Sequence, residues 1–247
     1  MSKRAGMLGS GSLTTIGASY RGIINGEVKD VELGCCIVSN EKARDNALKF
    51  EIPAALIFLI RPKDYPQDDS RVAFGNAIND VFDRMGVDFY AQLGWVPYTP
   101  DNVLEKRSGF NQHPAPVDPG YLDFGGPGMN NRAPHMARLI FCKRVNRRDP
   151  SRNIMWTEMT TQFVDKQPDK GAIILTERVP IFMDDDPLLM QERMKPIEHK
   201  LVMRTMEAFP AGKAVPYERP DRLVQLPGDF FDYAFAMEAT RDTFLKG

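Results

Sequence analysis

The sequence predicts an α/β fold of Rossmann-like type, with a mainly parallel twisted sheet and helices on both faces. Strand-like apolar runs alternate with segments of helical spacing along most of the chain, which is the pattern of βαβ units. A glycine-rich turn, Gly9-Ser10-Gly11-Ser12, separates the first strand candidate from the first helix candidate. The 247 residues, 43% of them hydrophobic, suffice for one large domain with a sizeable core.

The first half of the chain supplies four strand candidates. The first covers only 5–8, because Ser2-Lys3-Arg4 is polar, and we expect it to be very short or to lie at a sheet edge. Val31–Val38 is apolar enough for a buried strand and ends at Ser39-Asn40, a suitable N-cap for a following helix. The same reasoning predicts helices over 13–24, 41–50 and 69–85 and strands over 54–60 and 87–93.

The second half is less regular. Residues 111–135 are rich in Pro, Gly and Asn, which predicts a loop, and 139–142 would close a helix or begin a strand. Later segments predict strands over 157–164 and 172–179, a long helix over 187–209 interrupted at Pro196, and a helix over 229–244. We expect a catalytic domain over 1–209 and a C-terminal tail over 210–247 that ends in a short helix.

Composition excludes several classes of protein. The net charge of −1 provides no global attraction to nucleic acid or membrane. The longest apolar run, 54–60, is strand-sized, and the first residues are too short and polar for a signal peptide. Three cysteines, Cys35, Cys36 and Cys142, form no disulfide framework and match no zinc spacing, so we expect buried thiols, a cytoplasmic location and no metal.

An amide, an imidazole and a carboxylate are the strongest candidates for chemistry. Asn111 and His113 stand two residues apart in Phe110-Asn111-Gln112-His113-Pro114, so on an extended segment they point the same way. Asp169, at a later strand end, could orient the imidazole. Together they could stabilise an oxyanion and move a proton, as acyl transfer requires. The alternative is a loop histidine and an unrelated surface aspartate.

The N-terminal glycines suggest a phosphate site. Glycines let backbone amides approach an anion, and a helix N-terminus favours one. A dinucleotide fingerprint would need a third glycine and an acid after the second strand, but Ser12-Leu13-Thr14 and Asn40 stand there. A plain strand-to-helix turn is the alternative.

In their order, these pieces resemble the formyltransferase family that uses 10-formyltetrahydrofolate, over roughly residues 5–209. The resemblance is carried by the glycine turn, Gly94-Trp95-Val96-Pro97, Asn111-Gln112-His113-Pro114, Asp169-Lys170-Gly171-Ala172-Ile173-Ile174 and Glu198-His199. It implies formyl transfer from this folate co-substrate to an amine of a phosphorylated small molecule, with glycinamide ribonucleotide of purine biosynthesis the leading acceptor.

The resemblance also implies roles for individual residues. The catalytic set would be Asn111, His113 and Asp169. The folate would lie against Leu93, Trp95, Val96, Pro97, Val164, Asp165 and Gln167. The phosphorylated substrate would meet Gly9, Ser10, Gly11, Ser12 and Glu198, although an exposed helix glutamate is the alternative for the last.

Departures from the family pattern leave the acceptor open. Leu13, Pro97 and Gln162 replace an asparagine, an arginine and a histidine, and the stretch between His113 and Asp169 is longer than usual. Six cations within 138–152 could grip phosphates, or their charges could be offset elsewhere. Another amine acceptor (an amino-sugar nucleotide or a modified nucleobase), a nucleotide-binding oxidoreductase and a non-catalytic relative are the alternatives. We expect no nucleic-acid or membrane partner, and a homodimer stays open.

Overall fold

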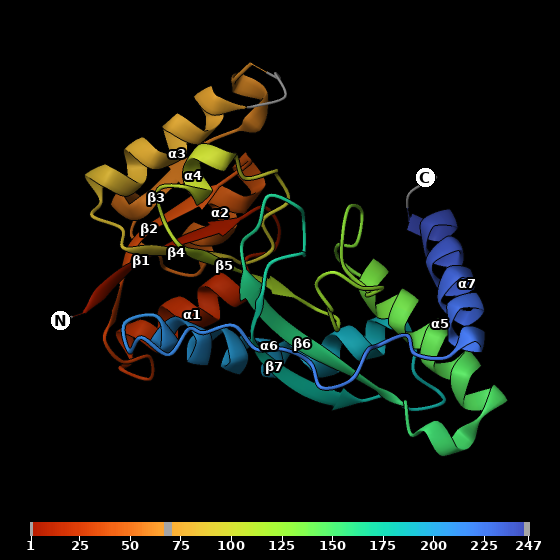
Figure 1. Ribbon diagram of the computed structural model, residues 1–247. Coiled ribbons are helices and arrows are strands. Elements are labelled where there is room, and N and C mark those ends of the chain that lie inside the picture. Colours follow the sequence, from red (N-terminus) through yellow and green to blue (C-terminus); the bar gives the residue numbers. More distant parts are fainter. Residues whose placement is uncertain (1, 67–70, 245–247) are drawn as a thin grey trace. The chain divides into compact units, whose positions relative to one another are not determined.

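A computed structural model describes residues 2–66 and 71–244, which fall into two compact units. The first unit comprises Met1–Gln112, Phe163–Lys166 and Val202–Val215. The second comprises His113–Gln162, Gln167–Leu201 and Pro216–Gly247. Each unit is built around its own arrangement of strands and helices (Figure 1).

The first unit contains parallel strands in the order β3-β2-β1-β4-β5. These strands are β1 (Lys3–Gly9), β2 (Val31–Val38), β3 (Ile57–Leu59), β4 (Phe89–Gln92) and β5 (Gly109–His113). The helices between them are α1 (Thr14–Ile24), α2 (Glu41–Lys49), α3 (Val72–Arg84) and α4 (Asp101–Leu104), with single 3₁₀ turns at Ala54–Leu56 and Pro62–Asp64. This alternation confirms the predicted fold class.

Strand β1 is central, so the expectation of a very short or edge strand is wrong. It pairs with β2 on one side and β4 on the other. The polar residues Lys3 and Arg4 fit a central strand because they lie at its N-terminal end, where they are exposed to solvent. There the Asp88 carboxylate accepts from the Lys3 amine at 3.0 Å and from the Arg4 amide at 2.8 Å. Only the following five residues are buried.

Helices cover both faces of this sheet (Figure 1). On one face Leu8 packs with Phe74 and Phe82 of α3. The next residue, Gly9, points the other way, toward Ile16 of α1, as expected for alternating side chains. Asn40 caps α2 as predicted, since its side chain accepts from the Ala43 amide at 2.9 Å.

The predicted elements of the first unit differ from the observed ones mainly at their ends. The strand predicted over 54–60 begins with the 3₁₀ turn and is reduced to β3. Helix α3 begins at Val72; residues 69 and 70 of its prediction lie outside the described part of the chain. All three cysteines are free and buried, as predicted, and burial raises the pKa of the Cys36 thiol to about 12.

The second unit holds an antiparallel strand pair and the longer helices. These elements are β6 (Trp156–Phe163), β7 (Ile173–Pro180), α5 (Ala133–Arg148), a 3₁₀ turn at Pro150–Arg152, and α7 (Pro227–Phe244); α6 (Pro187–Ala208) begins here. Residues 139–142 lie in the middle of α5 rather than at an element boundary. Helix α7 lies beside α5 (Figure 1), and both contribute to one apolar cluster with Phe124 and Met159.

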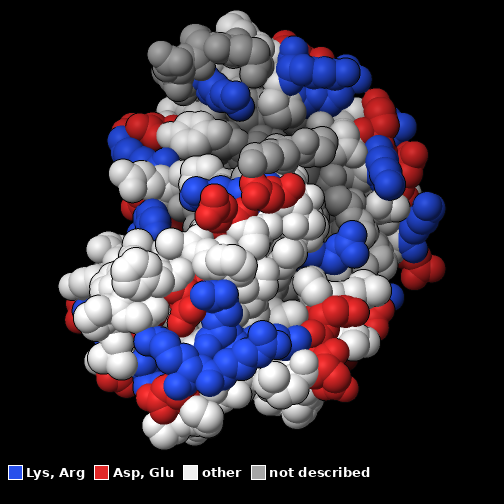
Figure 2. All heavy atoms as spheres, turned by 90° about the vertical axis from the view of Figure 1, so that its right-hand side faces the viewer, with Lys and Arg blue, Asp and Glu red and all other residues white. Residues whose placement is uncertain are grey.

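Three of the six cations of 138–152 are paired with carboxylates of this unit. Arg148 and Arg152 bind the buried Asp229 carboxylate of α7, at 2.5 and 3.0 Å, and Arg144 binds Asp232 at 2.8 Å. Arg138 is fully buried beneath aromatic rings. Figure 2 shows basic side chains gathered on this side of the molecule with acidic ones at the border. For these arginines the alternative of offset charges is therefore favoured over a phosphate grip, and they lie on α5 and the 3₁₀ turn that follows it.

Among the described residues, no helix is long and apolar enough to span a membrane, and no group of His, Cys, Asp and Glu is arranged to hold a metal ion.

The Asp229 contacts predict a defined acid sensitivity. Burial would raise the pKa of Asp229, but hydrogen bonds from Arg152, the Leu226 amide and Arg148 outweigh it and lower the pKa from 3.8 to about 2. Because the folded pKa is depressed, the ionised carboxylate stabilises the fold above about pH 4 and this contribution, about 2 kcal/mol, is lost as pH falls toward about 2.

We therefore expect Asp229→Asn to lower the free energy of unfolding near neutral pH by about 2 kcal/mol or more, since two arginines lose their carboxylate. Urea unfolding from about pH 7 to about pH 2.5 should show the gap to wild type closing with acid. Asp221→Asn, at an exposed tail position, is the control. A gap that stays constant with pH would contradict the assignment.

Candidate active site

The second unit brings His113 and Asp169 together. His113 is the last residue of β5, and Asp169 lies in the loop between β6 and β7. The Nδ1 atom of His113 lies 3.4 Å from Oδ1 of Asp169, and their side chains are 3% and 10% exposed. The predicted approach of these two residues is observed, although they are far apart in the sequence.

Two further donors hold the Asp169 carboxylate in place. Gln162 Nε2 donates to Oδ1 at 3.0 Å, and the Gly126 amide donates to Oδ2 at 2.9 Å. The backbone of Asp169 has φ 59°, a left-handed conformation that is uncommon for residues other than glycine but that aspartate adopts more readily than most. The carboxylate is therefore positioned by neighbours on two sides.

The second ring nitrogen of His113 also meets an oxygen acceptor. Its Nε2 atom lies 2.9 Å from the carbonyl oxygen of Phe124. A carbonyl and a carboxylate can only accept hydrogen bonds, so a ring with a proton on each nitrogen donates to both, whereas a neutral ring donates to one. Both ring nitrogens of His113 therefore face oxygen acceptors, which fix the orientation of the ring.

A close backbone approach shapes this corner. A Cβ atom at Gly125 would stand 2.6 Å from the Asp169 Cβ, so only glycine lets the loop pass so near the carboxylate. Phe124, Gly126 and Gln162 were not predicted from the sequence as partners of the pair. The Gly125-Gly126 doublet was a signal of tight backbone packing, but it could not show which side chain the backbone approaches.

His135, in α5, is a second buried histidine of this unit, and the charge of His113 acts on it. It is 2% exposed, and burial together with the charge of His113 lowers the pKa of His135 to about 4. This histidine is therefore neutral near pH 7 and cannot serve there as a cationic partner for substrate.

Asn111 lies on β5 two residues before His113 and belongs to the first unit. Its backbone is in register with Gln92 of β4, and its side chain is partly exposed. Strand alternation turns the side chains of residues 111 and 113 to the same side of β5.

In the first unit, the glycine turn is fastened at Ser10. The Ser10 hydroxyl bonds to the Ser39 hydroxyl at 2.8 Å and accepts from the Val96 amide at 3.1 Å, while Asn40 donates to the Ser10 carbonyl at 2.8 Å. Gly11 and Ser12 are exposed, and a Cβ at Gly11 would meet open space. In the described residues, no side chain caps the N-terminus of α1, which leaves amides available for an anion.

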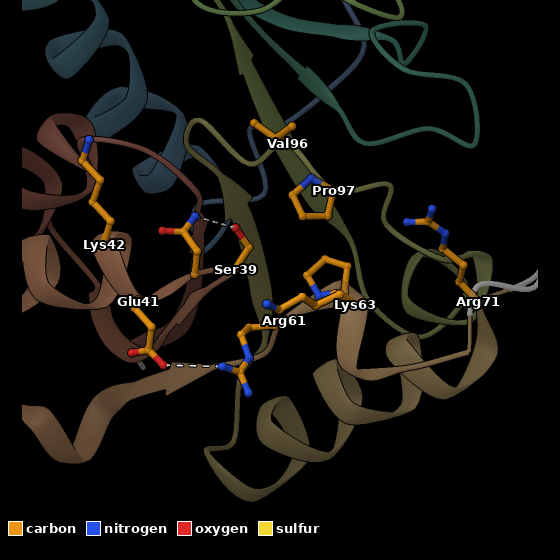
Figure 3. Close-up of a pocket in the computed structure, with 10 residues that line it drawn as sticks. Ser39, Glu41, Lys42, Arg61, Lys63, Arg71, Val96 and Pro97 are labelled. Atoms are coloured by element: carbon orange, nitrogen blue, oxygen red, sulfur yellow. Dashed lines mark hydrogen bonds and ion pairs between the residues drawn. The ribbon is translucent and has the colours of Figure 1, made fainter.

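A cavity of about 730 Å³ lies beside this turn in the first unit. Its walls include apolar Pro62, Val96 and Pro97 and the cations Lys42, Arg61, Lys63 and Arg71. Figure 3 shows Lys42 and Arg71 at opposite sides, with Pro97 between them. Arg61 is engaged by Glu41 at 3.6 Å and by Asp64 at 2.6 Å. Among the described lining residues, four are cations and one is a carboxylate, a balance that favours an anionic ligand.

The predicted folate residues differ in exposure. Leu93 and Trp95 are buried, and the Trp95 indole donates to Thr99 at 3.1 Å and stacks on Phe74, so these two could meet a ligand mainly through their backbone. Val96 is 66% exposed at the cavity wall.

The remaining predicted residues are distributed between the units. Val164 and Asp165 belong to the first, where the Val164 amide donates to the Gly109 carbonyl at 2.9 Å. Gln167 and Glu198 belong to the second; Glu198 is partly exposed on α6.

Known proteins with similar sequence or fold are formyl transferases and their relatives. The family model described as formyl transferase matches residues 3–206. The trifunctional purine biosynthetic protein adenosine-3 of Gallus gallus is 26% identical over 202 residues, which is 79% of this chain but only 17% of that protein.

Two solved structures show the likeness in fold. Glycinamide ribonucleotide transformylase 1 from Symbiobacterium toebii has a TM-score of 0.66 and 22% identity, covering 85% of this chain and 89% of that one. A formyltetrahydrofolate deformylase from Pseudomonas syringae pv. tomato has a TM-score of 0.63 and 15% identity, covering 86% of this chain and 62% of that one.

The close approach at Gly125 predicts a measurable loss of stability. We expect Gly125→Ala to lower the free energy of unfolding by about 1–3 kcal/mol, since the new methyl group must displace Asp169 or the loop. Gly11→Ala, whose methyl group meets open space, should change it by less than about 0.5 kcal/mol. Equal stabilities of the two variants in urea unfolding would argue against the packing described.

Proposed function

The chain belongs to the formyl transferase family, and on that premise we propose that it transfers a formyl group from 10-formyltetrahydrofolate to the amine of a phosphorylated small molecule. Glycinamide ribonucleotide is the leading acceptor, which would place the reaction in purine biosynthesis. The observation that carries the proposal is the buried His113–Asp169 pair, with 3.4 Å between Nδ1 and Oδ1, at the two positions that the family resemblance marks as catalytic.

In the proposed reaction, the neutral amine of the acceptor attacks the formyl carbon of the folate. Charge develops on the formyl oxygen, and donors aimed at that oxygen stabilise the transition state. We assign this role to the Asn111 amide and to protonated His113, whose Nε2–H would leave the Phe124 carbonyl to reach the formyl oxygen. Protonated His113, directly or through a water beside it, would give its proton to the departing folate nitrogen and would then take up the proton released by the attacking amine. Asp169 would orient the ring and balance its charge.

Binding roles follow from features of the first unit. The exposed Gly11 and Ser12 at an uncapped helix start support the proposal that the glycine turn binds the substrate phosphate. The exposed Val96 and the cavity of about 730 Å³ that it lines support the proposal that the folate lies near this wall. Volume and composition suit a ligand with an apolar ring and an anionic group. We propose no metal for the chemistry, and we propose residues 1–209 as the catalytic domain with 210–247 as its tail.

The acceptor is the open part of the proposal. An amino-sugar nucleotide or a modified nucleobase would use the same catalytic residues, and the cations of the cavity would suit its phosphates. Water as acceptor would make the reaction a deformylation, the activity for which the similar Pseudomonas syringae protein is named. These alternatives differ in the product, so one set of assays separates them.

The decisive experiment follows tetrahydrofolate release by purified full-length chain with 10-formyltetrahydrofolate. Turnover that requires glycinamide ribonucleotide supports the leading acceptor. Release without any amine indicates hydrolysis, and folate binding without release moves the search to other amines. Failure to bind a folate analogue would refute the proposal.

Substitution of the catalytic set should separate chemistry from binding. We expect His113→Ala and Asp169→Ala each to lose most of kcat, and Asn111→Ala to lose about 10²-fold or more as an oxyanion donor, while affinity for a folate analogue stays near wild type. Steady-state kinetics and calorimetric titration measure the two quantities. Near-normal kcat in a folded variant would refute the role of that residue.

A further inference from the structure

We propose that the C-terminal segment is a clamp that holds the 114–132 loop against the His113–Asp169 pair. Three side chains of this segment hold the loop and thereby position His113 and Asp169: Arg219, Arg222 and Tyr233. The catalytic meaning of this clamp rests on the proposed formyl transfer, whereas its structural content stands on contacts within the second unit alone.

The loop meets the pair through its backbone. The Phe124 carbonyl oxygen lies 2.9 Å from His113 Nε2, and the Gly126 amide donates to Asp169 at 2.9 Å. Backbone groups cannot adjust by changing rotamer, so the position of the whole loop sets both contacts. Apart from turns, residues 114–132 have no regular secondary structure, and the loop therefore depends on outside partners for its position.

Asp123 is the centre of the loop. Its carboxylate is buried and accepts from the Asp118 amide at 3.0 Å, the Gly125 amide at 3.1 Å and the Lys170 amine at 2.9 Å. These bonds fold residues 118–125 onto one carboxylate. The peptide that follows Asp123 leads directly to the Phe124 carbonyl.

Tyr233 of α7, 110 residues later in the sequence than Asp123, contacts both Asp123 and Phe124. Its hydroxyl donates to the Asp123 carbonyl at 2.8 Å, and its ring packs edge-on against the Phe124 ring with centroids 5.6 Å apart. Burial and the Asp123 charge raise the pKa of Tyr233 to about 12, so the hydroxyl remains a donor. One side chain thus fixes both residues that precede Gly125.

The two arginines fasten the start of the loop. Arg219 Nε donates to the Val117 carbonyl at 2.5 Å, and its guanidinium pairs with the buried Glu158 of β6. Burial lowers the pKa of Arg219 to about 10, which leaves it charged at neutral pH. Arg222 binds the Asp118 carboxylate at 2.8 Å and lies over the Tyr121 ring.

The clamp has a direct test in the full-length chain. We expect Tyr233→Phe, which keeps the ring, and Arg219→Met each to lower kcat about five- to tenfold with little change in KM for the folate, because small displacements of catalytic groups slow chemistry more than binding. Arg219→Lys should recover part of the loss. Phe231→Ala, at a 78% exposed position of the same helix, should leave kcat unchanged.

A spectroscopic arm separates this proposal from the proposed function. The ring ¹⁵N signals of His113, assigned with His113→Ala, should shift in Tyr233→Phe and Arg219→Met and remain in place in Phe231→Ala. Shifted signals in the variants of a protein whose wild type binds no folate analogue would support the clamp and refute formyl transfer. Wild-type signals and kcat in a folded Tyr233→Phe/Arg219→Met double variant would overturn the clamp.

Discussion

The candidate site depends on the contact between His113 and Asp169, because nearly every special feature around it serves to hold one of these two side chains. A left-handed φ of 59° and an approach that only Gly125 permits are both unfavourable in isolation. They occur together beside one carboxylate that receives hydrogen bonds from Gln162 and Gly126. Uncommon backbone geometry of this kind persists where the surrounding structure holds it, and ligand and active sites are among the places where it is found.

Most of the fold could be predicted because its signals are local. Apolar runs, helical spacing and the Asn40 cap identified β2, α2, β6, β7 and α6 to within a few residues. The error at β1 arose because polarity was taken as a sign of an edge. Lys3 and Arg4 sit at the strand entrance, where Asp88 from a distant segment satisfies them, and no local pattern reveals that partner. The prediction for residues 139–142 failed for a similar reason. Helix α7 packs against α5, so α5 carries apolar side chains on more than one face and shows little amphipathic periodicity.

The site was predictable only in its conspicuous members. His113 and Asp169 were found because few residue types carry this chemistry and both follow strand signals. Phe124 and Gly126 act through backbone atoms, which every residue possesses, so sequence could not single them out. Gln162 was noted only as a departure from the family pattern; its donation to Asp169 at 3.0 Å shows that an amide can orient this carboxylate.

The buried charges of the second unit explain why its C-terminal segment and the loop after His113 depend on each other. Asp118, Asp123, Glu158 and Asp229 are each at most 2% exposed, and a carboxylate at such depth is costly unless paired. Arg219 and Arg222 supply partners from the segment itself, and Arg148 and Arg152 of the α5 region bind Asp229 in return. Removing the arginines would leave the carboxylates buried without a partner charge, and removing the carboxylates would do the same to the arginines. The long loop after His113 and the C-terminal helix therefore form one interdependent part of the second unit, whose loop backbone contacts His113 and Asp169.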